Sequence, residues 1–324
     1  MKRPPRYSVP RSHDHADADD STTRRRGATA LFVMACLLVA GLSVTEAGDD
    51  RLSLFEALTL GAVEGATEYL PVSSTAHLVV VQELLGLRST PDTRAAADAY
   101  AVVIQVGAIA AVAGLYRARL TQMMRGITDG DVEGRRVLGR LLVAFTPAAL
   151  VGVVAGDFIQ DRFFGLWPIV IAWSVGGVAL IVPRVRAVRG ATALEHVSLS
   201  AAAAIGGAQV FAMWPGTSRS LVTIIAALAV GLTLKAAVEF SFLLGLITLS
   251  AATGFEAVTD GQSIVDTFGL STTIVGIVAA FIAAWVSMAW MVDYLQSRSL
   301  ALFGWYRIAA AAVVTGLIAL TELI

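Results

Sequence analysis

The chain has 324 residues, of which 56% are hydrophobic and 15% charged, and its mean hydropathy is +0.72. Values this apolar exclude an ordinary soluble domain and predict an integral membrane protein. The formal net charge of -1 matters less than the placement of the basic residues, and we expect no nucleic-acid partner. The single cysteine, Cys36, excludes an internal disulfide and a cysteine-based metal cluster.

The first 48 residues form an extension with two parts. Residues 1–26 are polar and end in three consecutive arginines, which predicts a disordered cytoplasmic tail. Residues 27–48 begin with an apolar run and predict a signal-anchor helix, because Thr45-Glu46-Ala47 is a poor cleavage site for a secretory signal. A cleaved signal is the alternative.

From residue 49 to residue 324 the apolar segments follow the same order twice. One segment interrupted by polar residues comes first, and three uninterrupted segments follow, each approaching the roughly 20 residues that a spanning helix needs. The ranges are 54–87, 95–116, 138–156 and 166–183, then 197–232, 236–258, 270–292 and 303–324. This order predicts an all-α membrane domain of two repeats, about 54–183 and 197–324. Each repeat would hold one re-entrant broken helix pair and three transmembrane helices, with the extra amino-terminal helix before them.

The two interrupted segments align on Pro71 and Pro215, each followed by small hydroxyl residues. Three predicted spans separate them, so the two segments would enter the membrane from opposite faces. Such an inverted repeat places its site near the midplane, between broken helices.

The basic residues give the orientation. With the amino terminus inside, the predicted inner segments carry 18 Lys and Arg residues and the outer loops carry four. Because basic residues gather on the cytoplasmic side, this distribution favours the proposed topology in a plasma membrane. Arg219 and Arg307 lie within apolar segments, and we expect Arg307, near the inner end of the last helix, to reach the membrane interface.

Two carboxylates mark the first interruption, in Glu64-Gly-Ala-Thr-Glu68. On a helix they share one face a turn apart, where like charges repel. A divalent cation, Mg²⁺ or Ca²⁺, would relieve the repulsion, since these ions bind one or two carboxylates together with substrate phosphates.

A helix break follows the carboxylates. Pro71 cannot continue the helix, and Ser73, Ser74 and Thr75 are residues favoured where a new helix begins. The free N–H groups of that second helix would form an anion site. His77 lies close enough in sequence to the hydroxyls to act as base, acid or nucleophile.

The second interruption, Pro215-Gly-Thr-Ser-Arg-Ser220, supplies a complementary set. Gly216 allows a ligand to approach the backbone, Thr217, Ser218 and Ser220 offer hydroxyls, and the planar fork of Arg219 suits phosphate. Carboxylates with a metal, hydroxyls, a histidine and a buried arginine point to a phosphate ester or anhydride. A site inside the membrane suggests that the phosphate is carried on a lipid.

These two motifs resemble those of the undecaprenyl pyrophosphate phosphatase family, also called bacitracin resistance proteins. The resemblance covers the chain from about Leu54 to its carboxyl end. Further similarity lies in Ile104-Gln105-Val-Gly-Ala, Glu239-Phe-Ser-Phe-Leu-Leu244 and Trp305-Tyr-Arg-Ile308. Two long motifs in the right order form a specific signal.

The resemblance implies a metal-dependent membrane hydrolase that converts undecaprenyl pyrophosphate to undecaprenyl phosphate at the outer face of the plasma membrane. It implies catalytic roles for Glu64, Glu68, Ser74 and His77, with Glu64 and Glu68 also binding the divalent cation. It implies pyrophosphate binding by Ser73, Thr75, Thr217, Ser218, Arg219 and Ser220. Either Ser74 or His77 would be the nucleophile. The expected partners are the polyprenyl pyrophosphate lipid and the membrane, and a homodimer is left open.

The chain departs from the family pattern at four places. Ala76 and Leu221 stand where the family usually has glycine, and Trp214 precedes the proline of the second motif. Gly245-Leu-Ile replaces the usual Ala-Ile-Pro after Phe-Leu-Leu. Ala76 and Leu221 keep open a third hypothesis, a non-catalytic resistance or scaffold protein. The main rival hypothesis is a carrier-lipid or anion transporter, which needs the arginine, hydroxyls and helix ends but not the carboxylate and histidine set.

The predicted topology can be tested by cysteine labelling. In a Cys36→Ser background, a membrane-impermeant thiol reagent should label Asp260→Cys from outside the cell and spare Asp20→Cys, because the predicted loop at 256–266 is external. The opposite labelling pattern would reverse the orientation.

Overall fold

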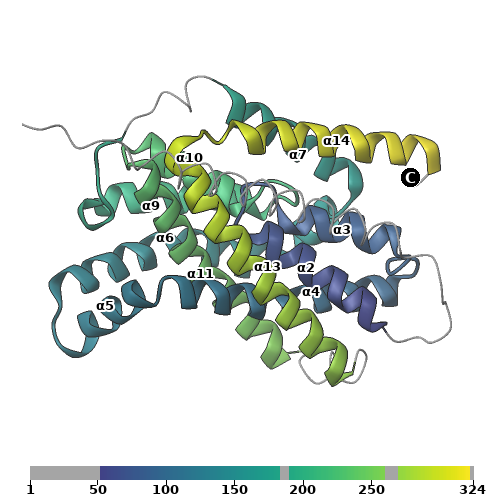
Figure 1. Ribbon diagram of the computed structural model, residues 1–324, viewed down its shortest axis with the longest axis horizontal. Helices are drawn as coiled ribbons and strands as arrows, with labels where there is room; N and C mark the ends of the chain where they lie inside the picture. The colour runs from purple at the N-terminus through teal and green to yellow at the C-terminus, as the bar shows by residue number, and fades with distance from the viewer. Residues whose placement is uncertain (1–51, 183–189, 260–268, 322–324) are drawn as a thin grey trace, which may run out of the picture. The chain divides into compact units, whose positions relative to one another are not determined.

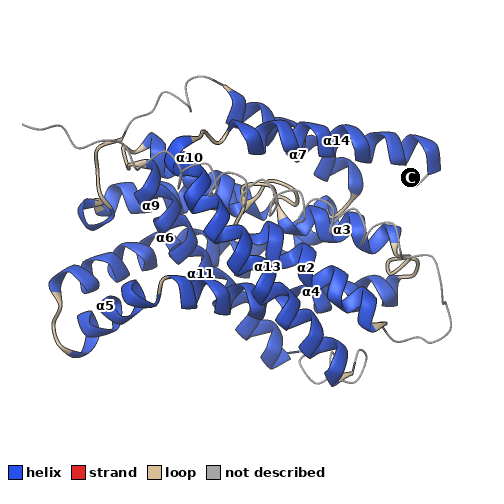
Figure 2. Cartoon of the chain, in the orientation of Figure 1, coloured by secondary structure: helices blue, strands red, loops and turns tan. Residues whose placement is uncertain are grey.

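The computed structural model describes residues 52–182, 190–259 and 269–321. These belong to a compact unit, Asp49–Ile324, that is separate from Met1–Gly48. The tail predicted over 1–26 and the signal-anchor helix predicted over 27–48 lie outside the described residues. Across the described ranges the chain consists of helices joined by turns and loops (Figures 1 and 2).

The helices of the two halves follow in order. The first half contains α2 (Leu54–Glu68), α3 (Ser74–Leu84), α4 (Pro91–Leu115), α5 (Arg117–Thr128), α6 (Val132–Phe163) and α7 (Leu166–Ile181). The second half contains the 3₁₀ turn η1 (Leu194–His196), α9 (Leu199–Gln209), the 3₁₀ turn η2 (Val210–Met213), α10 (Arg219–Ala229), α11 (Leu234–Thr259), α13 (Leu270–Ser297) and α14 (Ala301–Thr321).

Within the described ranges, five helices, α4, α6, α11, α13 and α14, are long and apolar enough to cross a membrane. The prediction of a multi-pass helical membrane protein is therefore confirmed. The third predicted span, 166–183, becomes the 16-residue helix α7, which ends at Ile181 and is too short by this measure. Helix α5 was not predicted, because its three arginines exclude it from a search for apolar segments.

Local sequence explains several helix starts. The Ser53 hydroxyl accepts from the backbone N–H of Glu56, and the Glu56 carboxylate accepts from the backbone N–H of Ser53, so the first turn of α2 is capped from both sides. Thr90 and Thr93 cap α4 in the same way, and Pro91 occupies its first turn, where no amide hydrogen is needed.

The helices of the two halves exchange partners. Helix α2 packs against α13, and α9 packs against α6, so the first helix of each broken segment contacts the second uninterrupted helix of the other half. Helix α4 contacts both α11 and α13, while α7 lies alongside α14 (Figure 1).

Glycines permit the closest of these contacts. A Cβ at Gly61 would overlap the carbonyl oxygen of Gly276 and lie 2.9 Å from its carbon. A Cβ at Gly65 would overlap the Ala280 carbonyl in the same helix, α13. Across the other exchanged pair, Gly206 lies in the same way against the Ala144 backbone. Small residues thus bring the helix backbones together, as is common inside membranes.

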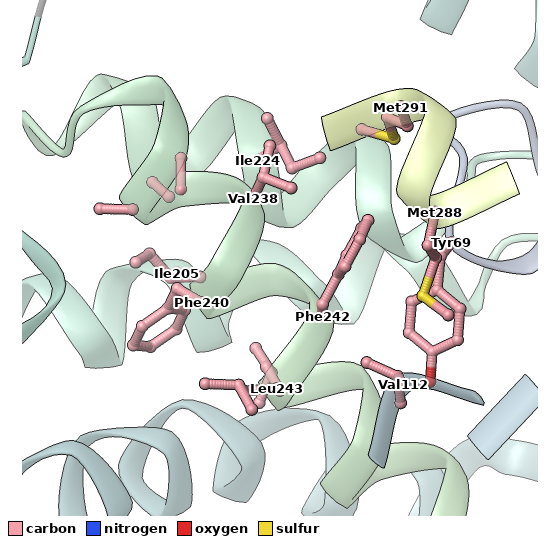
Figure 3. Close-up of a cluster of buried hydrophobic side chains, with 14 of the residues drawn as sticks. Tyr69, Val112, Ile205, Ile224, Val238, Phe240, Phe242, Leu243, Met288 and Met291 are labelled. Atoms are coloured by element: carbon pink, nitrogen blue, oxygen red, sulfur yellow. The ribbon is translucent and has the colours of Figure 1, made fainter. Parts of the chain in front are cut away.

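The first break, residues 69–73, lies between α2 and α3, and the second break, residues 214–218, lies between η2 and α10. The largest apolar cluster draws on both halves and lies next to the first break. Figure 3 shows Tyr69, from the first break, beside Met288 and Phe242. The Tyr69 and Phe242 rings meet edge to face, with centroids 5.1 Å apart. The first break therefore packs against apolar side chains that α11 and α13 contribute.

An arginine joins α5 to the second half. Arg119 donates to Glu239 of α11 at 2.8 Å, to Glu195 of η1 at 2.7 Å and to Gln122 of its own helix at 2.7 Å. The pKa of the Glu195 carboxyl lies below its ordinary value, because it accepts from its own backbone N–H and from Arg119. Glu239 thus has a structural role.

The glycine packing yields a stability prediction. Gly61→Ala should lower the thermal unfolding midpoint in detergent, because the added methyl meets backbone that cannot turn aside, at a cost of about 1–3 kcal/mol. Gly139→Ala in α6 is the control, since open space surrounds that position and alanine favours a helix by about 1 kcal/mol. Equal midpoints for the two variants would contradict the packing.

Candidate functional site between the two helix breaks

Two serines with unusual backbone angles mark the breaks. Ser73 has φ 73° and ψ 100°, and Ser218 has φ 74° and ψ 114°; they are the non-glycine residues with positive φ among the described ranges. Such conformations cost about 1–3 kcal/mol each and persist where the surroundings enforce them. Each serine immediately precedes the second helix of its break, α3 or α10.

The serines correct the alignment on the prolines. Ser73 lies two residues after Pro71, whereas Ser218 lies three residues after Pro215, so the proline alignment is wrong by one residue. With the serines matched, Ser74 of the first break corresponds to Arg219 of the second. The first residue of the helix after each break thus carries a different functional group, a hydroxyl in α3 and a guanidinium in α10.

Four consecutive backbone carbonyls of the first break, those of residues 70–73, accept hydrogen bonds from side chains. Ser220 Oγ donates to Leu70 at 2.8 Å, Arg307 Nη1 to Pro71 at 3.4 Å, Trp173 Nε1 to Val72 at 2.8 Å, and His77 Nδ1 to Ser73 at 2.6 Å. Because unpaired backbone groups are costly inside a membrane, these four side chains stabilise the break.

Arg307 contradicts the prediction that it would reach the membrane interface. Its side chain is fully buried, and Nη2 donates to Ala172 and to Gly216, both at 2.8 Å. Together with the Pro71 contact, these bonds tie both breaks to α7. Gly176 of α7 leaves the space that the guanidinium fills. Sequence reasoning was wrong because it weighed only the position of Arg307 along the helix.

Glu68 lies at the meeting point of the two breaks. Its Oε1 accepts from Arg219 Nη2 at 2.9 Å, and its Oε2 accepts a close hydrogen bond from the Ser74 hydroxyl. The Arg219 guanidinium also lies over the Tyr69 ring, 5.5 Å from its centroid. The structure thus brings together three of the predicted site residues, one of them from the other half.

Glu64, one turn earlier on α2, is fully buried, and both of its carboxylate oxygens have no hydrogen-bond partner among the described residues. The hydroxyl of Tyr69 is also buried without a partner in that part of the chain. Glu68 and Arg219 are the charged groups that act on Glu64. Two buried carboxylates side by side are costly, so the pair of Glu64 and Glu68 calls for a shared proton or a cation.

The residues present fit a divalent cation of the kind predicted. No three His, Cys, Asp or Glu side chains come together as a cluster within the described ranges. Glu64 offers two free oxygens and Glu68 lies beside it, which is the donor set that Mg²⁺ uses when substrate phosphates and water complete its shell.

The remaining predicted phosphate-binding hydroxyls divide into two groups. Thr75 and Thr217 are half-buried near the breaks. Ser218 Oγ accepts from the backbone of Leu221 at 3.3 Å and lies 3.0 Å from Ser220 Oγ. Ser73 and Ser220 are buried, and Ser220 serves the first break through its bond to Leu70.

The His77 ring forms its hydrogen bonds with Ser73 and Tyr306 and not with Glu68, Ser74 or Arg219. Its ring packs between Trp173 and Tyr306, with centroids 4.8 Å and 5.6 Å away. Nδ1 carries a proton toward the Ser73 carbonyl, so in the neutral ring Nε2 accepts from the Tyr306 hydroxyl at 2.7 Å.

Sequence reasoning did not assign Tyr69, Trp173 or Tyr306 to the site. The family similarity over Trp305-Tyr-Arg-Ile308 was the signal that could have drawn attention to Tyr306 and Arg307 as residues near the site.

These observations define a class of protein: a multi-pass helical membrane protein in which two helix breaks enclose a buried site of two carboxylates, a serine and an arginine. A family model described as bacitracin resistance protein BacA matches residues 57–313. The chain belongs to this family, so the resemblance seen in the sequence is confirmed.

Relatives in several bacteria carry the name undecaprenyl-diphosphatase. The protein of that name from Sorangium cellulosum is 42% identical over 80% of this chain and 85% of its own length. The one from Parvibaculum lavamentivorans is 38% identical over 79% and 93%. The one from Acinetobacter baumannii is 37% identical over 82% and 96%.

The buried arginine of α14 yields a prediction. Arg307→Lys should lower the thermal unfolding midpoint, because one ammonium cannot replace bonds to three carbonyls on separate segments, and each buried group left unpaired costs about 1–3 kcal/mol. Arg298→Lys, at an exposed position beyond α13, is the matched control. A midpoint unchanged in both variants would show that the carbonyl contacts contribute nothing.

Proposed function

We propose that the protein hydrolyses undecaprenyl pyrophosphate to undecaprenyl phosphate and inorganic phosphate at the outer face of the plasma membrane. This reaction would recycle the lipid carrier for cell-wall synthesis and confer bacitracin resistance. The observation that carries the proposal is the Glu68 carboxylate, which accepts at once from Ser74 of one break and from Arg219 of the other. The names of the relatives support it.

The contacts suggest how the residues divide the work. Glu68 is placed to take the proton of the Ser74 hydroxyl, so Ser74 Oγ would attack the terminal phosphorus as the bond to the bridging oxygen breaks. Undecaprenyl phosphate would leave, and water would then release inorganic phosphate from the serine. The fork of Arg219 would bind the phosphate oxygens. His77 is the less favoured nucleophile, because Nε2 already accepts from Tyr306.

We assign the predicted divalent cation to Glu64 and Glu68. The two free oxygens of Glu64 support this assignment. Bound there, Mg²⁺ or Ca²⁺ would offset the negative charge of the diphosphate. All the side chains that this proposal uses belong to one chain, so the proposed reaction does not require a homodimer.

The membrane plan that we propose is an inverted repeat with re-entrant breaks, open to the extracytoplasmic side. The exchanged pairs α2 with α13 and α9 with α6 support it, and so do the matched serines Ser73 and Ser218. Glu64 and Gln209 each lie nine residues before their serine, and both are buried. The second half therefore carries an amide where the first carries a carboxylate.

Transport without hydrolysis is not supported. A transporter needs no base on its serine, whereas Ser74 is bonded to Glu68 and the relatives are named as diphosphatases.

Phosphate release by purified protein tests the proposal. With undecaprenyl pyrophosphate, Glu68→Gln and Arg219→Ala should each reduce the rate roughly 10²–10⁴-fold, because one removes the base and the other the phosphate fork. EDTA should also reduce the rate, and Glu64→Gln should leave little activity for EDTA to remove.

Glu83→Gln is the control, because Glu83 makes only a loose ion pair with Arg88, 3.6 Å apart. Rates equal to wild type for both Glu68→Gln and Arg219→Ala would refute the assignment of the site. An EDTA-insensitive wild type would refute only the cation.

A further inference from the structure

The Arg219 guanidinium rests on a glycine of α11. A Cβ at Gly245 would overlap Nη1 of Arg219, and it would lie 2.5 Å from Cζ and 2.6 Å from Nη2. The other sides are also occupied: Nη2 donates to Glu68 at 2.9 Å, Nη1 to the Ser241 carbonyl at 3.4 Å, and the Tyr69 ring lies 5.5 Å from Cζ. We call this enclosure, formed by Gly245, Ser241, Glu68 and Tyr69, the arginine seat.

Gly245 is one of the places where the chain departs from the family pattern, with Gly245-Leu-Ile in place of Ala-Ile-Pro. Without the proline, α11 runs unbroken from Leu234 to Thr259. A glycine inside a helix costs about 1 kcal/mol relative to alanine. The family pattern combines alanine at this position with that proline, which bends a helix. In the unbroken α11 of this chain the guanidinium lies across Gly245, where a methyl group would overlap it.

We propose that Gly245 is a positioning residue for the reaction, because its missing side chain sets where Arg219 meets the diphosphate. The proposal rests on the proposed phosphate-binding role of Arg219. In the seat, Nη2 faces the carboxylate that also holds Ser74, so the fork and the attacking hydroxyl share one anchor. A methyl at position 245 would push the fork out of the seat and away from that anchor.

The substitution acts on Arg219 and not on the helix. The atoms that an added Cβ would meet are those of the guanidinium, the free end of a flexible side chain, and alanine itself favours the helix. Gly254, further along α11, has open space where its Cβ would lie. Gly254→Ala therefore makes the same chemical change in the same helix without touching Arg219.

The test compares kcat and KM for phosphate release, together with thermal unfolding midpoints. Gly245→Ala should lower kcat/KM roughly 10- to 100-fold, the loss expected from misplacing a binding group by about 1 Å. Its midpoint should stay above that of Arg219→Ala, which removes the buried ion pair with Glu68 altogether. Gly254→Ala should stay within about twofold of wild type.

A second pair of variants separates positioning from a general structural effect. In an Arg219→Lys background, Gly245→Ala should cost less than about twofold, because the ammonium has no planar fork to displace. A loss of the same size in both backgrounds would overturn the proposal, as would a lowered midpoint in both or wild-type kinetics for Gly245→Ala.

The same variants distinguish a failure of the proposed function from a failure of the arginine seat. If Arg219→Ala and Arg219→Lys keep full activity, Arg219 has no part in binding phosphate, and the seat has no role in the reaction. If both lose activity while Gly245→Ala does not, the proposed function stands and the seat alone is refuted.

Discussion

The ion pair between Glu68 and Arg219 is the interaction on which the site depends, because it links a break in one half of the chain to a break in the other. Both side chains are largely buried, and charges in such surroundings are stable only when they are paired. The pair fixes Ser74 through the second carboxylate oxygen and turns the arginine toward Tyr69. Under the proposed function, a diphosphate entering the site would compete with Glu68 for the same guanidinium, which would couple substrate binding to release of the base.

That arrangement requires two interrupted helices to hold their shape inside a membrane. The broken backbone exposes carbonyls that no helix satisfies, and four side chains from four places in the chain bind them in sequence over residues 70–73. Arg307 contributes most, since it reaches both breaks and α7 at once. Ser220, predicted to bind phosphate, and His77, predicted to be catalytic, thus also hydrogen-bond the backbone of the first break.

The composition and the two motifs were enough to predict a multi-pass helical protein and the residues that meet at Glu68. Charged and hydroxyl side chains in apolar sequence have few reasons to be there, so residue type marked Glu68, Arg219 and the group of hydroxyls. The family resemblance then singled out Ser74 among those hydroxyls. The direction of His77 could not, because it depends on Trp173 and Tyr306, which come from distant helices. The one-residue offset between the breaks was hidden for a similar reason, since the strained serines, and not the prolines, occupy equivalent places.

Gln209 lies as many residues before Ser218 as Glu64 lies before Ser73, and its side chain limits where charge can enter the apolar helices. A second buried carboxylate at that place would give protons and cations another site to occupy within the apolar helices. An amide neither takes up a proton near neutral pH nor attracts a metal ion strongly. With Gln209 nine residues before Ser218, the second break has a buried amide at the spacing where the first break has the ionisable Glu64.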